Sequence, residues 1–230
     1  VEMMKRRIVL SGRVVAALTA VAALAGLSLA ATPFAAQAEQ GETVIVALGD
    51  SLTAGYGLPN GQSFPVQLED ALRKRGHNVR VLNAGVSGDT AAAALRRLDW
   101  ALPDEADAVI VELGGNDALQ GLPPEATEAA LSTIVEKVQA KGLPVLLAGM
   151  EAPRNLGKDY VTAFSAIYPE LAARYKLILY PFFLEGAALN AELMQTDGIH
   201  PNDKGVAVIV QNILPKVEAL LAASKSNEDG

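Results

Sequence analysis

Three side chains in this sequence have the types and spacing needed to activate a nucleophile. Ser51 directly follows an apolar run in the stretch VIVALGDSLTAGYG, Val44 to Gly57. A serine hydroxyl is a weak nucleophile unless an adjacent base removes its proton. His200 is one of only two histidines, and it follows Asp197 by three residues in the loop TDGIHPN. Such a loop can place the carboxylate beside the imidazole Nδ1, where it stabilises the imidazolium that proton transfer creates.

Each of these residues also has a purely structural interpretation. Ser51 could cap a helix, and Asp197 could stabilise its own turn. The other histidine, His77, precedes an expected strand, which is the wrong end of a strand for a site in a parallel α/β fold. His200 is therefore the base that the sequence offers to Ser51, and Ser87 is the rival nucleophile.

Two glycine-containing loops add donors of the kind that a negatively charged oxygen requires. Gly85 leaves room for its backbone N–H to approach a ligand. In the segment GGNDAL, Asn116 carries a neutral NH₂ donor, which suits an oxyanion that forms and then collapses. The amide of Ser51 is a third candidate, since it lies where a helix is expected to begin. Both loops could instead be ordinary turns, and we assign Asp50 and Asp117 structural roles in orienting them.

The elements that must position these residues alternate along the chain. Apolar runs without polar alternation predict buried strands at Val44–Leu48, Val79–Leu82, Ala108–Leu113, Val145–Ala148 and Leu177–Tyr180. Helices are expected between them at Phe64–Arg75, Thr90–Ala101, Ala126–Lys141 and Tyr160–Arg174. A last helix is expected at Asp203–Leu221, capped by Asn202 or Asp203 and kinked or broken at Pro215.

This alternation predicts a doubly wound α/β domain with a parallel sheet. In that architecture, chemistry collects at the carboxyl ends of the strands, near the point where strand order reverses. The loops carrying Ser51, Gly85 and Asn116 each follow one of the first three expected strands, and His200 follows the last. We therefore expect these residues to meet at one edge of the sheet.

Four blocks of the chain together resemble the SGNH (GDSL) hydrolase family, in the family's order. They are Gly49-Asp50-Ser51-Leu52, Gly85, Gly114-x-Asn116-Asp117 and Asp197-x-x-His200. The segments ALGDSLTAGYGL, NAGVSGDT, ELGGNDAL and TDGIHPN are similar in particular to the exported bacterial arylesterase, thioesterase I and lysophospholipase subgroup.

This resemblance implies a flavodoxin-like three-layer α/β/α sandwich with a five-stranded parallel sheet in the order 2-1-3-4-5. It implies that Ser51 is the nucleophile, His200 the base and Asp197 its partner. The amides of Ser51 and Gly85, with the Asn116 side chain, would form the oxyanion hole. The implied reaction is hydrolysis of carboxylic esters or thioesters through an acyl-Ser51 intermediate, with no metal or cofactor.

Aliphatic residues after the third and fourth expected strands suggest an apolar groove for an acyl chain, although they could equally be ordinary loop packing. They are Leu119, Leu122, Met150, Pro153 and Leu156. The expected partner is a small-molecule or lipid ester or thioester, and we expect a monomer. A carbohydrate O-acetyl esterase of the same family is the alternative enzyme, and a non-catalytic α/β binding module is the alternative outside enzymes.

The first residues have the layout of a secretory signal peptide. Lys5-Arg6-Arg7 precedes an apolar run over 14–31, and Ala36-Gln37-Ala38 is a suitable cleavage site. An uncleaved membrane anchor is the alternative. Cleavage after Ala38 would leave a domain at 39–223 and a flexible tail at 224–230, with no stable membrane anchor.

Composition limits the partners and the compartment of this chain. Residues 39–230 carry 15 basic and 25 acidic residues, a net charge of about −10, which disfavours nucleic-acid binding. The 230 residues include no cysteine, so disulfides and thiol chemistry are excluded. The expected location is outside the cytoplasm, and the resemblance favours the periplasm.

Overall fold

The computed structural model describes residues 41–228 of the chain. The expected signal peptide, residues 1–38, lies outside the described residues. The chain divides into two units, of which the second begins at Glu39, and the fold below is that of this second unit.

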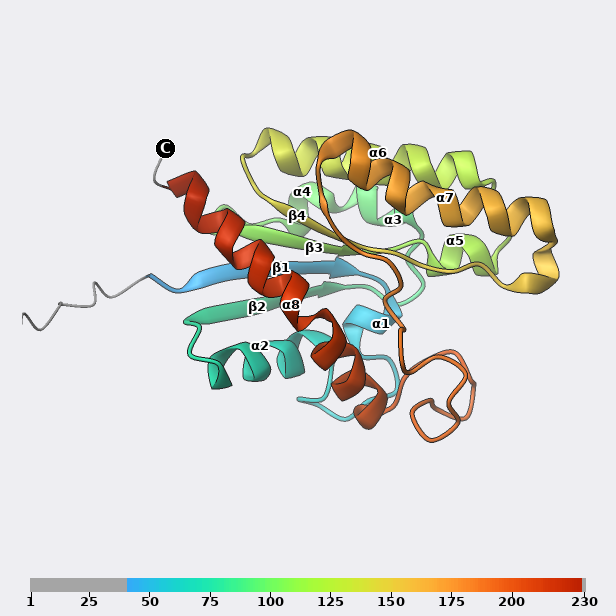
Figure 1. Ribbon diagram of the computed structural model, residues 1–230, viewed down its shortest axis with the longest axis horizontal. Coiled ribbons are helices and arrows are strands. Elements are labelled where there is room, and N and C mark those ends of the chain that lie inside the picture. The colour runs from blue at the N-terminus through green and yellow to red at the C-terminus, as the bar shows by residue number, and fades with distance from the viewer. Residues whose placement is uncertain (1–40, 229–230) are drawn as a thin grey trace, which may run out of the picture. The chain divides into compact units, whose positions relative to one another are not determined.

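A five-stranded parallel sheet forms the centre of the domain (Figure 1). Its strands are β1 (Thr43–Gly49), β2 (Val79–Gly85), β3 (Ala108–Glu112), β4 (Val145–Ala148) and β5 (Ile178–Tyr180). The order is β2-β1-β3-β4-β5, as the family resemblance predicted. Every residue of β3 and β4 is buried, as expected for strands of a parallel sheet that helices cover on both faces.

The register of the strands decides which loops lie side by side. Gly49 at the end of β1 pairs with Gly85 of β2 on one side and with Glu112 of β3 on the other. The loops after these three strands therefore leave the sheet at neighbouring positions. This is the point where strand order reverses, because β1 lies between the strand that follows it and the strand after that.

Helices cover both faces of the sheet (Figure 1). On one face, α2 (Phe64–Lys74) packs against α8 (Asp203–Glu228). On the other face lie α3 (Ala91–Arg96), α6 (Pro124–Ala140) and α7 (Lys158–Tyr175). Four short segments follow strands or other helices: α1 (Ser51–Ala54), α4 (Leu98–Ala101), α5 (Gly115–Leu119) and the 3₁₀ turn η1 (Arg154–Leu156).

The helix predicted at Thr90–Ala101 is in fact two helices, α3 and α4, separated at Arg97. The Arg97 guanidinium turns inward, where it donates to the Asp89 carboxylate at 2.6 Å and to the Gly49 carbonyl at 3.0 Å. The break therefore coincides with a side chain that reaches the end of β1.

The last helix does not break at Pro215. It passes through the proline without ending, and buried residues on both sides, Leu214 and Val217 among them, hold it against the core. Residues 224–228, which belong to the expected flexible tail, continue the helix. Asn202 caps it as predicted, since its Oδ1 accepts from the amides of Lys204 and Gly205 at 3.0 Å each.

The same helix is the one element within residues 41–228 that is long and apolar enough to cross a bilayer. Its apolar face is buried inside the domain, with Val206, Ile209, Ile213 and Val217 each no more than 1% exposed. This burial is the property of a core helix.

Gly149, which follows β4, provides a test of the packing at the sheet's carboxyl edge. A Cβ at this position would lie 2.2 Å from the Pro181 carbonyl oxygen, which belongs to the backbone and has little freedom to move. We therefore expect G149A to lower the free energy of unfolding by about 2–3 kcal/mol in urea titrations. G41A is the control, because a Cβ there meets nothing within 4 Å. Equal stabilities of the two variants would contradict the packing described here.

Candidate active site

Ser51 is the first residue of α1, directly beyond the carboxyl end of β1. The buried Asp50 side chain caps this helix, since its Oδ1 accepts from the Leu52 amide at 3.0 Å. Gly55 ends the helix with a φ of +84°, a conformation that glycine adopts without strain. A helix of four residues has little stability of its own, so the position of Ser51 depends on these local bonds.

The His200 loop is closed by backbone pairing between Met194 and Pro201. The Gln195 amide donates to the His200 carbonyl at 2.8 Å inside this closure. Asp197 shapes the tip of the loop, because its Oδ1 accepts from the amides of Ile199 and His200 at 2.9 and 3.0 Å.

A glutamine joins this loop to the segment that carries the serine. The Gln195 Nε2 donates to the Tyr56 carbonyl at 2.7 Å and to the Pro201 carbonyl at 3.0 Å. The Tyr56 ring also lies against the His200 ring, with 4.6 Å between their centroids. The imidazole is thereby held from its own loop and from the residues just after α1.

Ser51, His200 and Asp197 form one hydrogen-bonded chain. His200 Nε2 lies 2.9 Å from Ser51 Oγ, and His200 Nδ1 lies 2.7 Å from Asp197 Oδ2. The bonds from the His200 amide and side chain, with the Ile199 amide, lower the pKa of Asp197 to about 2. Because Asp197 is then ionised at neutral pH, it favours the tautomer with the proton on Nδ1, which leaves Nε2 free to accept the Ser51 proton.

The residues expected to bind an oxyanion are near Ser51, but two of them have protein partners. Asn116 Nδ2 donates to Asp50 Oδ2 and to the Asp89 carbonyl at 3.0 Å each. The Gly85 amide donates to Asn83 Oδ1 at 3.0 Å. The Ser51 amide lies in the first turn of its helix, where amides have no partner within the helix.

The two aspartates that flank the expected catalytic positions are buried and bonded to backbone amides. Asp117 Oδ2 accepts from the Ala91 amide at the start of α3, at 2.9 Å. Burial raises the pKa of Asp50 to about 6, although its bonds from Leu52 and Asn116 and the nearby His200 act in the opposite direction. Both residues orient loops, in agreement with the structural roles assigned to them from the sequence.

A cavity of about 450 Å³ opens beside Ser51 and His200. Three of the five residues expected to form an acyl groove line it: Leu119, Met150 and Pro153. Leu122 and Leu156 are not among the lining residues of this cavity. The Leu122 carbonyl instead accepts from the Tyr160 hydroxyl at 2.7 Å, which turns this segment toward α7.

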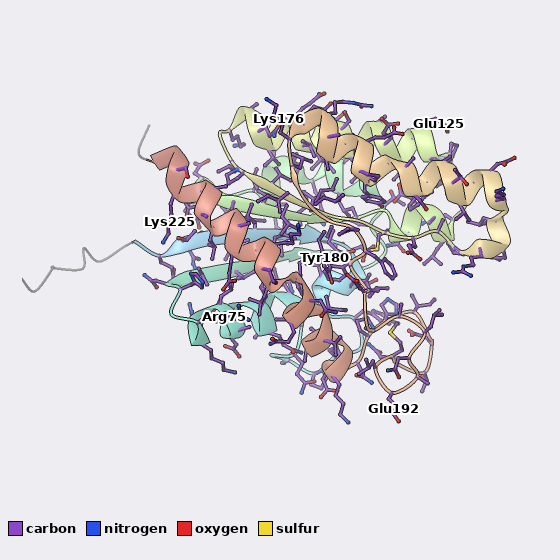
Figure 2. The ribbon with its side chains drawn as sticks, viewed as in Figure 1. Arg75, Glu125, Lys176, Tyr180, Glu192 and Lys225 are labelled. Carbon is purple, nitrogen blue, oxygen red and sulfur yellow. The ribbon has the colours of Figure 1, made fainter. Side chains whose placement is uncertain are left out.

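Sequence reasoning missed one whole wall of the cavity. It comes from the segment between β5 and α8, on which Figure 2 places Glu192, and includes Phe182, Leu184, Leu189 and Met194. Ile199, beside the histidine, also lines the cavity. The segment has neither helical nor strand periodicity, and its density of apolar residues was the one signal that it faces a site.

Comparison with known proteins finds relatives that are esterases and thioesterases. Residues 47–208 match the model of the GDSL-like lipase/acylhydrolase family. The esterase TesA of Pseudomonas aeruginosa is 41% identical over 181 residues, which cover 78% of this chain and 90% of that protein. Thioesterase 1/protease 1/lysophospholipase L1 of Escherichia coli K12 is 42% identical over 167 residues, covering 72% and 78%. The crystal structure of AlinE4, an SGNH-hydrolase family esterase, is 48% identical with a TM-score of 0.67, covering 79% of this chain and 98% of that one.

Proposed function

Since this chain belongs to the GDSL-like lipase/acylhydrolase family, we propose that it hydrolyses carboxylic esters and acyl thioesters through an acyl intermediate on Ser51. The observation that carries this proposal is the chain of bonds from Asp197 through His200 to Ser51, at 2.7 and 2.9 Å, at an apolar cavity.

In the proposed reaction, Ser51 Oγ attacks the carbonyl carbon of the substrate while His200 Nε2 takes the serine proton. The ionised Asp197 stabilises the resulting imidazolium. The tetrahedral intermediate then collapses, and His200 gives the proton to the departing alcohol or thiol. Water attacks the acyl-Ser51 ester by the same route, which releases the carboxylic acid and returns the proton to Ser51.

The cavity favours an acyl chain over a sugar. Leu119, Leu189 and Ile199 line it and are still 53%, 100% and 44% exposed, so aliphatic surface extends from the serine to the solvent. Exposed apolar side chains around one cavity commonly mark a binding site for apolar ligands. A carbohydrate O-acetyl esterase would instead require polar groups around the bound sugar. Faster hydrolysis of acetylated xylan than of p-nitrophenyl decanoate would favour that alternative.

The assignment of the nucleophile can be tested with a pair of serine variants. We expect S51A to lose nearly all hydrolysis of p-nitrophenyl butyrate and decanoyl-CoA, because no other hydroxyl is bonded to His200 Nε2 within residues 41–228. Ser87 is exposed in the loop after β2, and S87A is the matched control that should keep its activity.

A serine-directed phosphonate provides the chemical counterpart of this test. Ser51 Oγ would displace the leaving group at phosphorus, and mass spectrometry of the digested protein should find the adduct on the peptide that contains Ser51. An adduct on Ser87, or full activity of S51A, would overturn the proposed mechanism. Absence of both labelling and hydrolysis in the wild-type protein would favour a non-catalytic binding module.

The oxyanion hole is proposed to consist of the Ser51 and Gly85 amides and the Asn116 side chain. We expect N116A to lower kcat by a factor on the order of 10²–10³ with a smaller change in KM, the typical loss when one such donor is removed. Steady-state kinetics on p-nitrophenyl butyrate measure both constants. N60A, in an exposed loop, is the control. An N116A enzyme with wild-type kcat would remove Asn116 from the hole.

We also propose that residues 1–38 are a signal peptide and that the enzyme acts in the periplasm. The basic residues at 5–7, the apolar run and the Ala-x-Ala site support this proposal. Expression of the full chain in a Gram-negative host should yield a periplasmic protein whose first residue is Glu39 by N-terminal sequencing. Recovery of the enzyme in the cytoplasm with residues 1–38 intact would contradict it.

A further inference from the structure

The Glu112 side chain has no part in the proposed reaction, yet it bonds to residues on both sides of Ser51. It is the last residue of β3, and its Cα pairs with Gly49 of β1 and with Ala148 of β4. The residue is 0% exposed. A glutamate is almost never buried to this extent without a partner of opposite charge.

Glu112 accepts two hydrogen bonds from the segment that carries Ser51. Glu112 Oε2 accepts from the Thr53 hydroxyl at 2.6 Å and from the Asp50 amide at 3.4 Å. These two residues lie on either side of Ser51 in the chain. The fit is close, because a Cβ on Gly49 would lie 2.1 Å from Thr53 Oγ1 and 2.6 Å from Glu112 Oε2.

The surroundings of this carboxyl oppose a negative charge. Its other oxygen, Oε1, is buried without a hydrogen-bond partner, and Glu112 forms no ion pair within residues 41–228. The titratable groups that face it are Asp50 before α1 and the Tyr168 phenol of α7, with Asp117 of α5 close to both. The Arg97 guanidinium, which donates to the Gly49 carbonyl, forms its ion pair with Asp89.

We propose that Glu112 is a positioning residue that holds the Asp50–Thr53 segment as a neutral carboxyl, which adds no negative charge of its own near Ser51. This inference rests on the proposed function, because its purpose is to serve the acyl transfer at Ser51. Burial, with the nearby Asp50 as a second cause, raises the pKa of Glu112 well above its ordinary value, in agreement with the geometry.

A neutral group at this position has a physical advantage for the proposed reaction. The tetrahedral intermediate places a negative charge on an oxygen near the Ser51 amide. A glutamate charge on the adjacent buried strand would repel that oxygen through a region of low dielectric. A neutral carboxyl supplies the same acceptor oxygen to Thr53 and to the Asp50 amide without this repulsion.

Replacement of Glu112 by glutamine tests the proposal, because glutamine keeps the acceptor oxygen and cannot ionise. We expect E112Q to retain kcat within about threefold of wild type at pH 7, whereas E112L, which lacks the acceptor, loses roughly tenfold or more. T53V removes the hydroxyl partner and should lower kcat in the same direction as E112L. E125Q, at an exposed position in the first turn of α6, is the control.

The pH dependence of stability gives a readout that packing alone would not change. In the unfolded chain Glu112 ionises above its ordinary pKa of 4.5, whereas burial and the nearby Asp50 raise this pKa in the folded protein, where we propose that the group is protonated. Wild type therefore loses stability as pH rises above this value, and E112Q is spared this loss. We expect the Tm of E112Q minus that of wild type to increase steadily from pH 4 to pH 8, while the same difference for E125Q does not increase.

Two results would overturn the proposal. One is a Tm difference between E112Q and wild type that does not change with pH, since Glu112 would then be ionised in the folded protein. The other is a folded E112Q enzyme with kcat as low as that of E112L. Phosphonate labelling of Ser51 separates this outcome from failure of the proposed function. If the wild-type protein is labelled at Ser51, the nucleophile is assigned correctly whatever the kcat of E112Q.

Discussion

The hydrogen bond between His200 and Ser51 is the contact on which the whole site depends, and it joins residues 149 positions apart in the chain. Neither residue lies in an element that is rigid by itself, since one belongs to a four-residue helix and the other to a loop. The parallel sheet fixes where the helix with Ser51 begins, and the start of α8 fixes where the loop with His200 ends. Gln195 then links the two directly through the Tyr56 carbonyl. A distance of 2.9 Å between loops is thus maintained by bonds across the gap as well as by the scaffold on either side.

Buried acids at the carboxyl edge of the sheet supply much of this order. Asp50, Glu112 and Asp117 are each at most 2% exposed, and together they accept hydrogen bonds from three backbone amides. Burying a carboxyl is unfavourable unless hydrogen bonds compensate for the lost water. A core built for stability alone would have apolar residues here. Three buried acids close to the Ser51 turn are typical of a place where local stability is given up for the geometry of a site.

The sequence was sufficient to predict the parts of this molecule that depend on hydrophobic periodicity or on short motifs. Apolar runs located all five strands, and the short motifs identified the three residues that meet at 2.7 and 2.9 Å. It was insufficient where a distant contact overrides local preference. The break between α3 and α4 lies at Arg97, whose side chain bonds to Gly49, and α8 continues with its apolar face buried through Pro215 and past Ser224. The segment between β5 and α8 has no periodicity, so its role as a wall of the cavity could not be predicted.

The proposed oxyanion donors already have protein acceptors, and this affects how strongly they bind the neutral ester and the oxyanion of the intermediate. Asn116 Nδ2 already donates to Asp50 and to the Asp89 carbonyl, and the Gly85 amide donates to Asn83. A neutral ester carbonyl is a weaker acceptor than the Asp50 carboxylate or the amide oxygens of Asp89 and Asn83, and it gains little by competing for these hydrogens. The oxyanion of the intermediate is a much stronger acceptor and competes well. An interaction that becomes favourable only as charge develops lowers the barrier without tightening substrate binding, which is the condition for a contact to raise kcat. The protein acceptors would then orient the donors until the charge appears.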